Sequence, residues 1–92
     1  MSLKLRFHPR AAGEWRRLDP QLRRQFEKKL IQVIELGGVG KRLRPPLQDC
    51  YKIKLRSSGY RLVYELDEEK TPIVLAVGKR DESYLRAVKR HR

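Results

Sequence analysis

Basic and apolar side chains alternate in the segment Tyr51-Lys52-Ile53-Lys54-Leu55-Arg56. Successive side chains of a β-strand point to opposite faces of the sheet, so Lys52, Lys54 and Arg56 share one face if this segment is a strand. Like charges placed so close repel one another, and a bound anion relieves that repulsion. A cluster that lowers the stability of a fold is more often a binding site than an accident, so we expect an anion here. The alternative is a strand face that only meets solvent.

Cations from two further segments are expected to join this cluster. Arg61 lies on the strand expected over residues 60–66, and Lys79 and Arg80 follow the strand expected over residues 72–77. Three neighbouring strands would then bring cations together on the face of the sheet that no helix covers. Such a face favours phosphate groups as its ligand.

If the anion is an RNA phosphate, these residues could cleave RNA without a metal ion. The ribose 2′-OH would attack the adjacent phosphate, which requires a general base, charge stabilisation for the phosphorane and help for the leaving oxygen. Lys54 is the candidate base, because neighbouring cations disfavour its charged form and lower its pKa from about 10.4. An arginine gives up its proton reluctantly, since its pKa exceeds about 12, so Arg80 is better suited to stabilising charge than to donating a proton.

Tyr84 supplies an aromatic ring close to the cationic cluster. Such a ring can stack on an RNA base that has left its own stack. The ring could instead pack the last helix onto the sheet, because Tyr84, Ala87 and Val88 have the i, i+3, i+4 spacing of a helix face. The periodicity favours neither interpretation.

Periodicity and turn residues predict the elements that position these side chains. The expected order is a strand over 3–7, helices over 9–18 and 20–36, a loop over 37–49, antiparallel strands over 51–56, 60–66 and 72–77, and a short helix around 84–90. Asp19 and Pro20 are suited to start the second helix, and Gly37 and Gly38 to end it. We expect an α+β fold with the helices on one face of a twisted sheet.

Composition and charge narrow the class of protein. The 92 residues suffice for one domain, and 23 Lys and Arg against 11 Asp and Glu give a formal net charge of +12. Basic residues occur along the whole chain, which favours nucleic acid, and after it an anionic membrane, as the target. The longest apolar run, residues 73–77, is too short to span a bilayer, and the charged N-terminus is unlike a signal peptide.

The sequence contains no motif for a metal or a cofactor. Cys50, His8 and His91 lie far apart along the chain, which is not the spacing of a zinc site. The glycines of segment 37–41 lack the spacing of a phosphate-binding loop. With one cysteine there is no internal disulfide, which fits the cytoplasm. We therefore expect a cytoplasmic protein without metal or cofactor, in which Cys50 is a small buried residue.

The segment from Asp49 to Tyr64, DCYKIKLRSSGYRLVY, resembles the central hairpin of the RelE toxins. The segments EWR at 14–16, VGKR at 77–80 and AVKR at 87–90 match in the same order, so the resemblance covers nearly the whole chain. It implies a RelE/ParE-like fold, similar to compact microbial RNases, in one domain over residues 1–92. It also implies the toxin of a type II toxin–antitoxin system, which enters the ribosomal A site and cuts mRNA to leave a 2′,3′-cyclic phosphate and a 5′-OH.

The resemblance implies a role for each matched residue. Lys54 would be the general base, and Lys52 and Arg61 would hold the phosphate and stabilise its transition state. Arg80 would assist the leaving oxygen, and Tyr84 would orient an mRNA base by stacking. Further cations would hold ribosomal RNA of the small subunit. On helices, such residues are usually just a solvated face. These cations are Arg16, Arg17, Arg23, Arg24, Lys28, Lys41, Arg42, Arg44, Arg56 and Lys79.

The resemblance also implies partners. A cognate RelB-like antitoxin would bind with an extended, partly helical segment and displace or distort the last helix. It would also contact operator DNA, and no membrane would be involved. The chain departs from the family pattern between Arg80 and Tyr84, where it is about two residues shorter. Tyr84 is therefore aligned from the matching segment at 87–90.

Two other functions stay open on the sequence. One is a ParE-like inhibitor of DNA gyrase with the same fold. Such an inhibitor would not need four catalytic cations together, which here are Lys52, Lys54, Arg61 and Arg80. The other is a non-catalytic module that binds RNA or the ribosome. In such a module Lys54→Ala would weaken binding modestly, whereas in the nuclease it would leave ribosome binding intact and slow cleavage.

Overall fold

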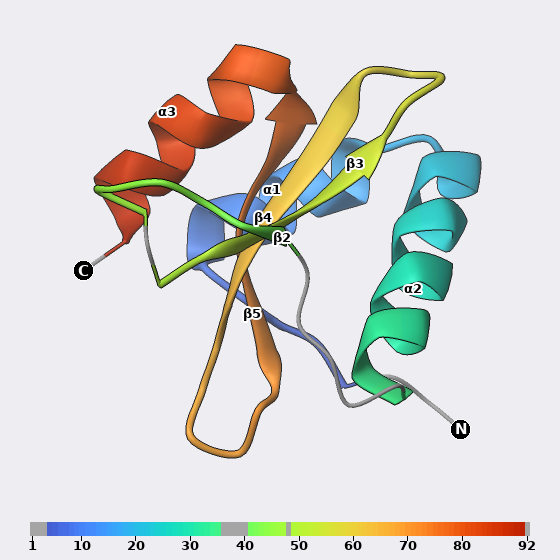
Figure 1. Ribbon diagram of the computed structural model, residues 1–92. Coiled ribbons are helices and arrows are strands. Elements are labelled where there is room, and N and C mark those ends of the chain that lie inside the picture. The colour runs from blue at the N-terminus through green and yellow to red at the C-terminus, as the bar shows by residue number, and fades with distance from the viewer. Residues whose placement is uncertain (1–3, 36–40, 48, 92) are drawn as a thin grey trace.

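The computed structural model of the protein describes residues 4–35, 41–47 and 49–91, without the side chains of Lys41 and Arg80 (Figure 1). The elements are β1 (Arg6–Phe7), α1 (Pro9–Arg17), α2 (Pro20–Glu35), β2 (Lys41–Arg42), β3 (Tyr51–Leu55), β4 (Tyr60–Leu66), β5 (Pro72–Lys79) and α3 (Arg80–Arg90). The α+β fold expected from the sequence is confirmed. The expected start of the first strand at Leu3 and the glycines at 37 and 38 lie outside the described residues.

The described strands form one five-stranded sheet in the order β1-β5-β4-β3-β2. Its centre is the predicted antiparallel run of β3, β4 and β5. β1 pairs with β5 in parallel, because α1 and α2 carry the chain away from β1 before the central strands begin. β2 was expected to be part of a loop, but Lys41 and Arg42 pair with Lys52 and Tyr51. Two residues are too few to show strand periodicity in a sequence.

Helices cover both faces of the sheet, and the expectation that they cover one face is wrong. Leu62 packs with Phe26 and Leu30 of α2, whereas its neighbour Val63 packs with Ala87 of α3. Adjacent strand residues point to opposite faces, so α3 lies across the sheet from α2 (Figure 1). The sequence of β4 shows why, because an apolar side chain on the second face also needs a cover.

The start of each helix follows from local sequence. The carboxylate of Asp19 accepts a hydrogen bond from the backbone N–H of Gln21 at 2.9 Å, and Pro20 opens α2, as predicted. α3 begins at Arg80, earlier than expected, with Asp81 and Glu82 in its first turn, where carboxylates interact favourably with the helix dipole. Among the helices that the structure describes, none combines the length and the apolar character that crossing a membrane requires.

Candidate active site

Lys54 and Arg61 form the centre of the candidate site. They are direct partners across β3 and β4, so their side chains lie on the same face of the sheet. The Lys54 side chain is exposed, whereas Arg61 is only 8% exposed. Together with Leu55, Arg56 and Gly59 they line an open hollow of about 350 Å³. The structure thus brings together three of the cations that the sequence placed on one face.

One donor of the Arg61 guanidinium makes no hydrogen bond within the described residues. Its Nη1 donates to the carbonyl oxygen of Gly59 at 3.2 Å, but its buried Nε has no acceptor among the described residues. The residue opposite Arg61 on β5 is Gly78, which has no side chain to supply one. A buried donor without an acceptor costs about 1–3 kcal/mol. An anion that reaches this group would remove that cost.

The turn between β3 and β4 sets the positions of this pair. Gly59 has a φ of 76°, a backbone conformation that glycine adopts without strain. The hydroxyl oxygen of Ser58 accepts a hydrogen bond from the backbone N–H of Tyr60 at 3.3 Å. From α2, the ammonium of Lys29 donates to the carbonyl oxygen of Lys54 at 3.0 Å. The backbone of the hairpin is therefore held from within and from the helix. Nothing in the spacing of the residues indicated this role for Lys29.

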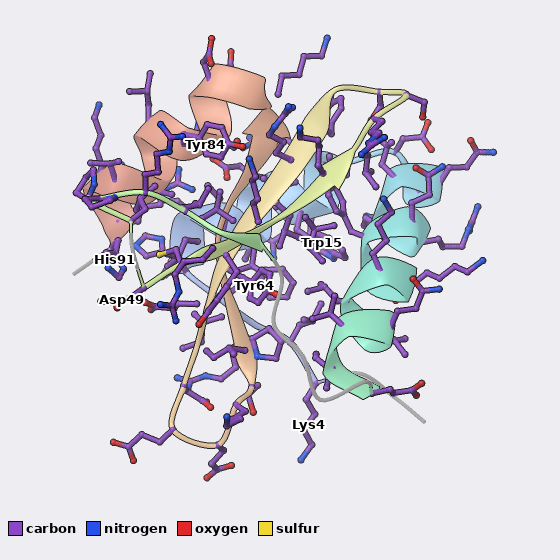
Figure 2. The ribbon with its side chains drawn as sticks, in the orientation of Figure 1. Lys4, Trp15, Asp49, Tyr64, Tyr84 and His91 are labelled. Carbon is purple, nitrogen blue, oxygen red and sulfur yellow. The ribbon has the colours of Figure 1, made fainter. Side chains whose placement is uncertain are left out.

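Lys52 and Tyr84 meet where β3 passes under α3. The ammonium nitrogen of Lys52 lies 5.6 Å from the centroid of the Tyr84 ring, within the range of a cation–π contact. The ring packs against the apolar cluster of Val63 and Ala87, and the Tyr84 hydroxyl is buried without a hydrogen-bond partner in the described part of the chain (Figure 2). The structure thus shows the packing role for Tyr84. Stacking on an RNA base stays a prediction.

Two cations at the end of β5 behave differently from expectation. The ammonium nitrogen of Lys79 lies 5.9 Å from the ring of Tyr60, which packs on the α1–α2 side of the sheet. The prediction that Lys79 joins the cluster is therefore wrong, because Lys79 and Gly78 alternate across the sheet and Gly78 takes the position beside Arg61. Arg80 is the first residue of α3, and its side chain lies outside the described residues.

The other predicted RNA-binding cations are spread over several surfaces. Arg23 is half-buried and donates from Nη1 to the carbonyl oxygen of Arg16 at 3.2 Å. Arg42 donates to the hydroxyl of Tyr51 at 3.3 Å. The side chain of Lys41 is not among those that the structure describes. Arg42 and six further residues are exposed, and the role of these six stays a prediction: Arg16, Arg17, Arg24, Lys28, Arg44 and Arg56.

A buried ionic cluster of Glu14, Arg86 and Arg90, called here the Glu14 cluster, joins α1 to α3. The Glu14 carboxylate accepts from Nη1 and Nη2 of Arg90 at 2.9 and 2.8 Å, and it lies 3.1 Å from Nη1 of Arg86. It also accepts from the backbone N–H of Val77 at 3.2 Å. Burial raises the pKa of Glu14, but the hydrogen bonds from Arg90 and Val77 and the charges of both arginines outweigh burial, so its pKa lies below the ordinary 4.5.

Reasoning from periodicity and spacing missed this cluster. Glu14 and Arg90 are 76 residues apart. Their only signal is that both lie in short segments, EWR and AVKR, that match the RelE toxins.

Comparison with known proteins agrees with this fold. A family model described as the ParE toxin of a type II toxin–antitoxin system, parDE, matches residues 5–84. The mRNA interferase toxin RelE of Escherichia coli is 48% identical over 93 residues, which cover 98% of each chain. The chain belongs to the RelE/ParE toxin family. The resemblance seen in the hairpin is thereby confirmed for almost the full length.

Solved structures of E. coli RelE, free and in complex with its antitoxin, are similar to the structure of this RelE/ParE toxin. A double arginine-to-alanine mutant of RelE in the free state is 46% identical, with a TM-score of 0.79 and full coverage of both chains. The intact E. coli RelBE toxin–antitoxin complex also matches at 46% identity, with a TM-score of 0.70 over 87% of this chain and 99% of that one. The fold is therefore that of a RelE toxin.

Proposed function

We propose that this protein is the toxin of a type II toxin–antitoxin system and an endoribonuclease that cuts mRNA in the ribosomal A site, inhibiting translation. The observation that carries the proposal is the pair of Lys54 and Arg61 on one face of an open hollow. The buried Nε–H of Arg61 has no acceptor in the part of the chain that the structure describes. The high identity to a protein named as an mRNA interferase supports it.

In the proposed reaction the ribose 2′-OH attacks the adjacent phosphate. Lys54 takes the proton of that hydroxyl, because it is the exposed amine at the hollow. Arg61 and Lys52 stabilise the charge that develops on the phosphorane oxygens. Arg80 assists the leaving 5′ oxygen by its charge, and Tyr84 orients a base. The products are a 2′,3′-cyclic phosphate and a 5′-OH: the leaving oxygen takes up a proton from solvent, and Lys54 releases the proton of the 2′-OH to solvent. These steps need no metal ion in the proposed reaction.

The ribosome supplies what the hollow lacks. An in-line attack requires the 2′-OH, the phosphorus and the leaving oxygen to be aligned, and alignment accounts for a large part of the barrier. The hollow is open, and its lining comes from β3, β4 and the turn between them, so it does not clamp a flexible RNA. Purified protein should therefore cut free RNA weakly.

The proposed partners follow from the family. We infer that a RelB-like antitoxin neutralises the protein and contacts operator DNA for it, since an E. coli relative is known in a RelBE complex. The exposed cations of α1 and α2 are placed to hold ribosomal RNA of the small subunit. The site of action is the cytoplasm, and no membrane takes part.

A second candidate is inhibition of DNA gyrase, because the matching family model is described by the ParE toxin. This function would not require the cationic pair at the β3–β4 hairpin. The two candidates therefore differ in how toxicity responds to substitution of Lys54.

Primer extension on ribosomes that carry a defined A-site codon tests the proposal. We expect a new stop inside that codon with ribosomes and none on the same mRNA without them. Lys54→Ala should slow cleavage by about 10²- to 10⁴-fold while leaving ribosome binding intact. Lys4→Ala is the matched control, because it removes an exposed lysine before β1, the far edge strand of the sheet (Figure 2).

Two outcomes would reject the nuclease. One is no stop on any codon together with inhibition of gyrase supercoiling. The other is full cleavage and toxicity in Lys54→Ala and Arg61→Ala, which would remove the site assignment.

A further inference from the structure

Cys50, Glu65 and His91 meet at the end of the sheet farthest from the hollow. Their ligand atoms, one sulfur, one carboxylate oxygen and one imidazole nitrogen, all lie within 4.8 Å of one another. The Cys50 sulfur is 3.5 Å from Nδ1 of His91, and that nitrogen is 3.2 Å from Oε2 of Glu65. These three residues are called the C-terminal triad below.

The two separations from Nδ1 of His91 fit a tetrahedral metal ion. Bonds of about 2.3 Å to sulfur and about 2.0–2.2 Å to nitrogen and oxygen separate neighbouring ligands by about 3.5 Å for sulfur and nitrogen and about 3.3 Å for nitrogen and oxygen. The observed separations are 3.5 and 3.2 Å. A thiolate, an imidazole and a carboxylate together favour zinc or cobalt(II) over magnesium or calcium.

Hydrogen bonds alone satisfy the triad only in part. Nδ1 of His91 has either one proton or one lone pair, yet both the thiol of Cys50 and the carboxylate of Glu65 lie against it. If Nδ1 donates to Glu65, it cannot accept from the thiol, and the reverse also holds. A metal ion would bind all three groups at once.

The backbone around the triad is already fixed. The N–H of Cys50 donates to the carbonyl oxygen of Leu47 at 2.9 Å, and the carbonyl oxygen of Cys50 accepts from Leu43 at 3.1 Å. Glu65 lies within β4, in register with Ile73 of β5. The N–H of His91 donates to the carbonyl oxygen of Ala87 at 2.8 Å and closes α3. The three ligands therefore come from β4, α3 and the residue before β3, with little freedom to move apart.

We propose that the C-terminal triad is a binding site for one divalent ion of the zinc class, which fastens the end of α3 to β3 and β4. Three protein ligands leave a fourth position for solvent, and the side chains of Glu65 and His91, 30% and 12% exposed, allow the ion to enter. Binding forms an Sγ–metal bond, breaks the S–H bond of Cys50 and releases that proton to solvent. This site is separate from the hollow, because Cys50 lies four residues along the chain from Lys54, about 13 Å in a strand.

The alternative for Cys50 is a reactive thiol, and its surroundings oppose that. Burial, followed by the charges of Glu65 and Asp49, raises the pKa of Cys50 to about 12. A thiol with so high a pKa is neutral at physiological pH and a poor nucleophile. The same acidic surroundings attract a cation. Sequence spacing predicted no zinc site, because the ligands are 15 and 26 residues apart and only the fold brings them together.

Cobalt(II) and zinc titrations of the chelator-treated protein test the proposal. We expect one cobalt ion per chain, with a sulfur-to-cobalt charge-transfer band in the near ultraviolet that zinc abolishes. Zinc at a hundredfold excess over its Kd should raise the Tm by roughly 10 °C or more, because only the folded chain holds the three ligands together. Neither measurement uses RNA cleavage, so the result stands apart from the proposed nuclease activity.

Single substitutions assign the site. Cys50→Ser should remove the charge-transfer band, but Cys50 is fully buried and this variant could unfold. His91→Ala and Glu65→Gln change partly exposed side chains, and each should weaken zinc binding at least about tenfold while the fold is kept. His8→Ala is the matched control, as it removes the other histidine and should leave affinity unchanged. The proposal is overturned if wild-type protein shows no band and no zinc-dependent Tm, or if His91→Ala and Glu65→Gln bind zinc as tightly as wild type.

Discussion

Glu14→Gln should destabilise the protein more than any other single charge removal on α1 or α3. The Glu14 side chain is only 9% exposed and accepts both nitrogens of the Arg90 fork, whose own side chain is 10% exposed. The substitution leaves the shape of residue 14 almost unchanged but removes its charge. Arg90 then remains buried without its counter-ion, although its Nη1 still donates a hydrogen bond to the carbonyl oxygen of Leu75 at 2.9 Å.

The magnitude follows from the burial of the pair. Removing one partner of a buried ion pair costs about 3–5 kcal/mol. The amide oxygen of glutamine can still accept one hydrogen bond, and Arg86, at 41% exposed, can turn to solvent. The loss should therefore lie at the lower end, about 3 kcal/mol. For a domain of this length each kcal/mol corresponds to about 4–8 °C, so the Tm should fall by roughly 12–24 °C.

Thermal and urea unfolding followed by far-ultraviolet circular dichroism measure this loss. Glu82→Gln is the control, because Glu82 is 66% exposed and its ion pair with Arg86 is an i,i+4 contact of 3.5 Å. That variant should lose no more than about 0.5 kcal/mol. In a double-mutant cycle, Glu14→Gln and Arg90→Gln should be strongly non-additive. Equal losses for Glu14→Gln and Glu82→Gln, or additive losses in the cycle, would refute the argument.

Three further predictions concern the pH dependence and the candidate site. Folding lowers the pKa of Glu14, so its contribution to the free energy of unfolding is complete above pH 4.5 and is lost as the pH falls through the lower pKa of the folded state. In Glu14→Gln the free energy of unfolding, measured with urea, should therefore vary less with pH in that range. Gly59→Ala should lower the free energy of unfolding by about 1–2 kcal/mol, measured by thermal unfolding. The cause is backbone strain at a φ of 76° and not a clash, because no described atom beyond the chain neighbours lies within 4 Å of the added Cβ. Gly13→Ala within α1 is the control and should raise the free energy of unfolding by up to about 1 kcal/mol. Tyr84→Phe should leave the Tm unchanged or raise it, because the buried hydroxyl has no partner among the described residues; a clear drop would show a missed hydrogen bond.

The parts of the fold that could be predicted are those whose causes are local. The bounds of β4, Tyr60–Leu66, match the expectation, because alternation and the turn at Gly59 are both encoded within a few residues. The pairing of Lys54 with Arg61 follows from the same hairpin, since a short turn fixes the register of its strands. The cationic hollow was therefore accessible from sequence alone.

The parts that could not be predicted depend on contacts between distant segments. Lys79 was assigned to the wrong face, because the register of β5 against β4 is set by long-range packing and includes an irregularity at Val63 and Tyr64. The side of the sheet that α3 covers has no signature within α3 itself. The Glu14 cluster and the C-terminal triad likewise join residues tens of positions apart, and periodicity reports only on neighbours.

The position of α3 determines how much of the cationic face is open. Its first residue follows β5 directly, and a Cβ added at Gly78 would make an ordinary contact of 3.4 Å with Nη1 of Arg86. Its last turn is held by Arg90 in the Glu14 cluster and by His91. Between these two ends, Tyr84 lies over Lys52. Because both ends are fixed by groups outside the hollow, a change that loosens the C-terminal end should move Tyr84 relative to Lys52 without touching Lys54 or Arg61.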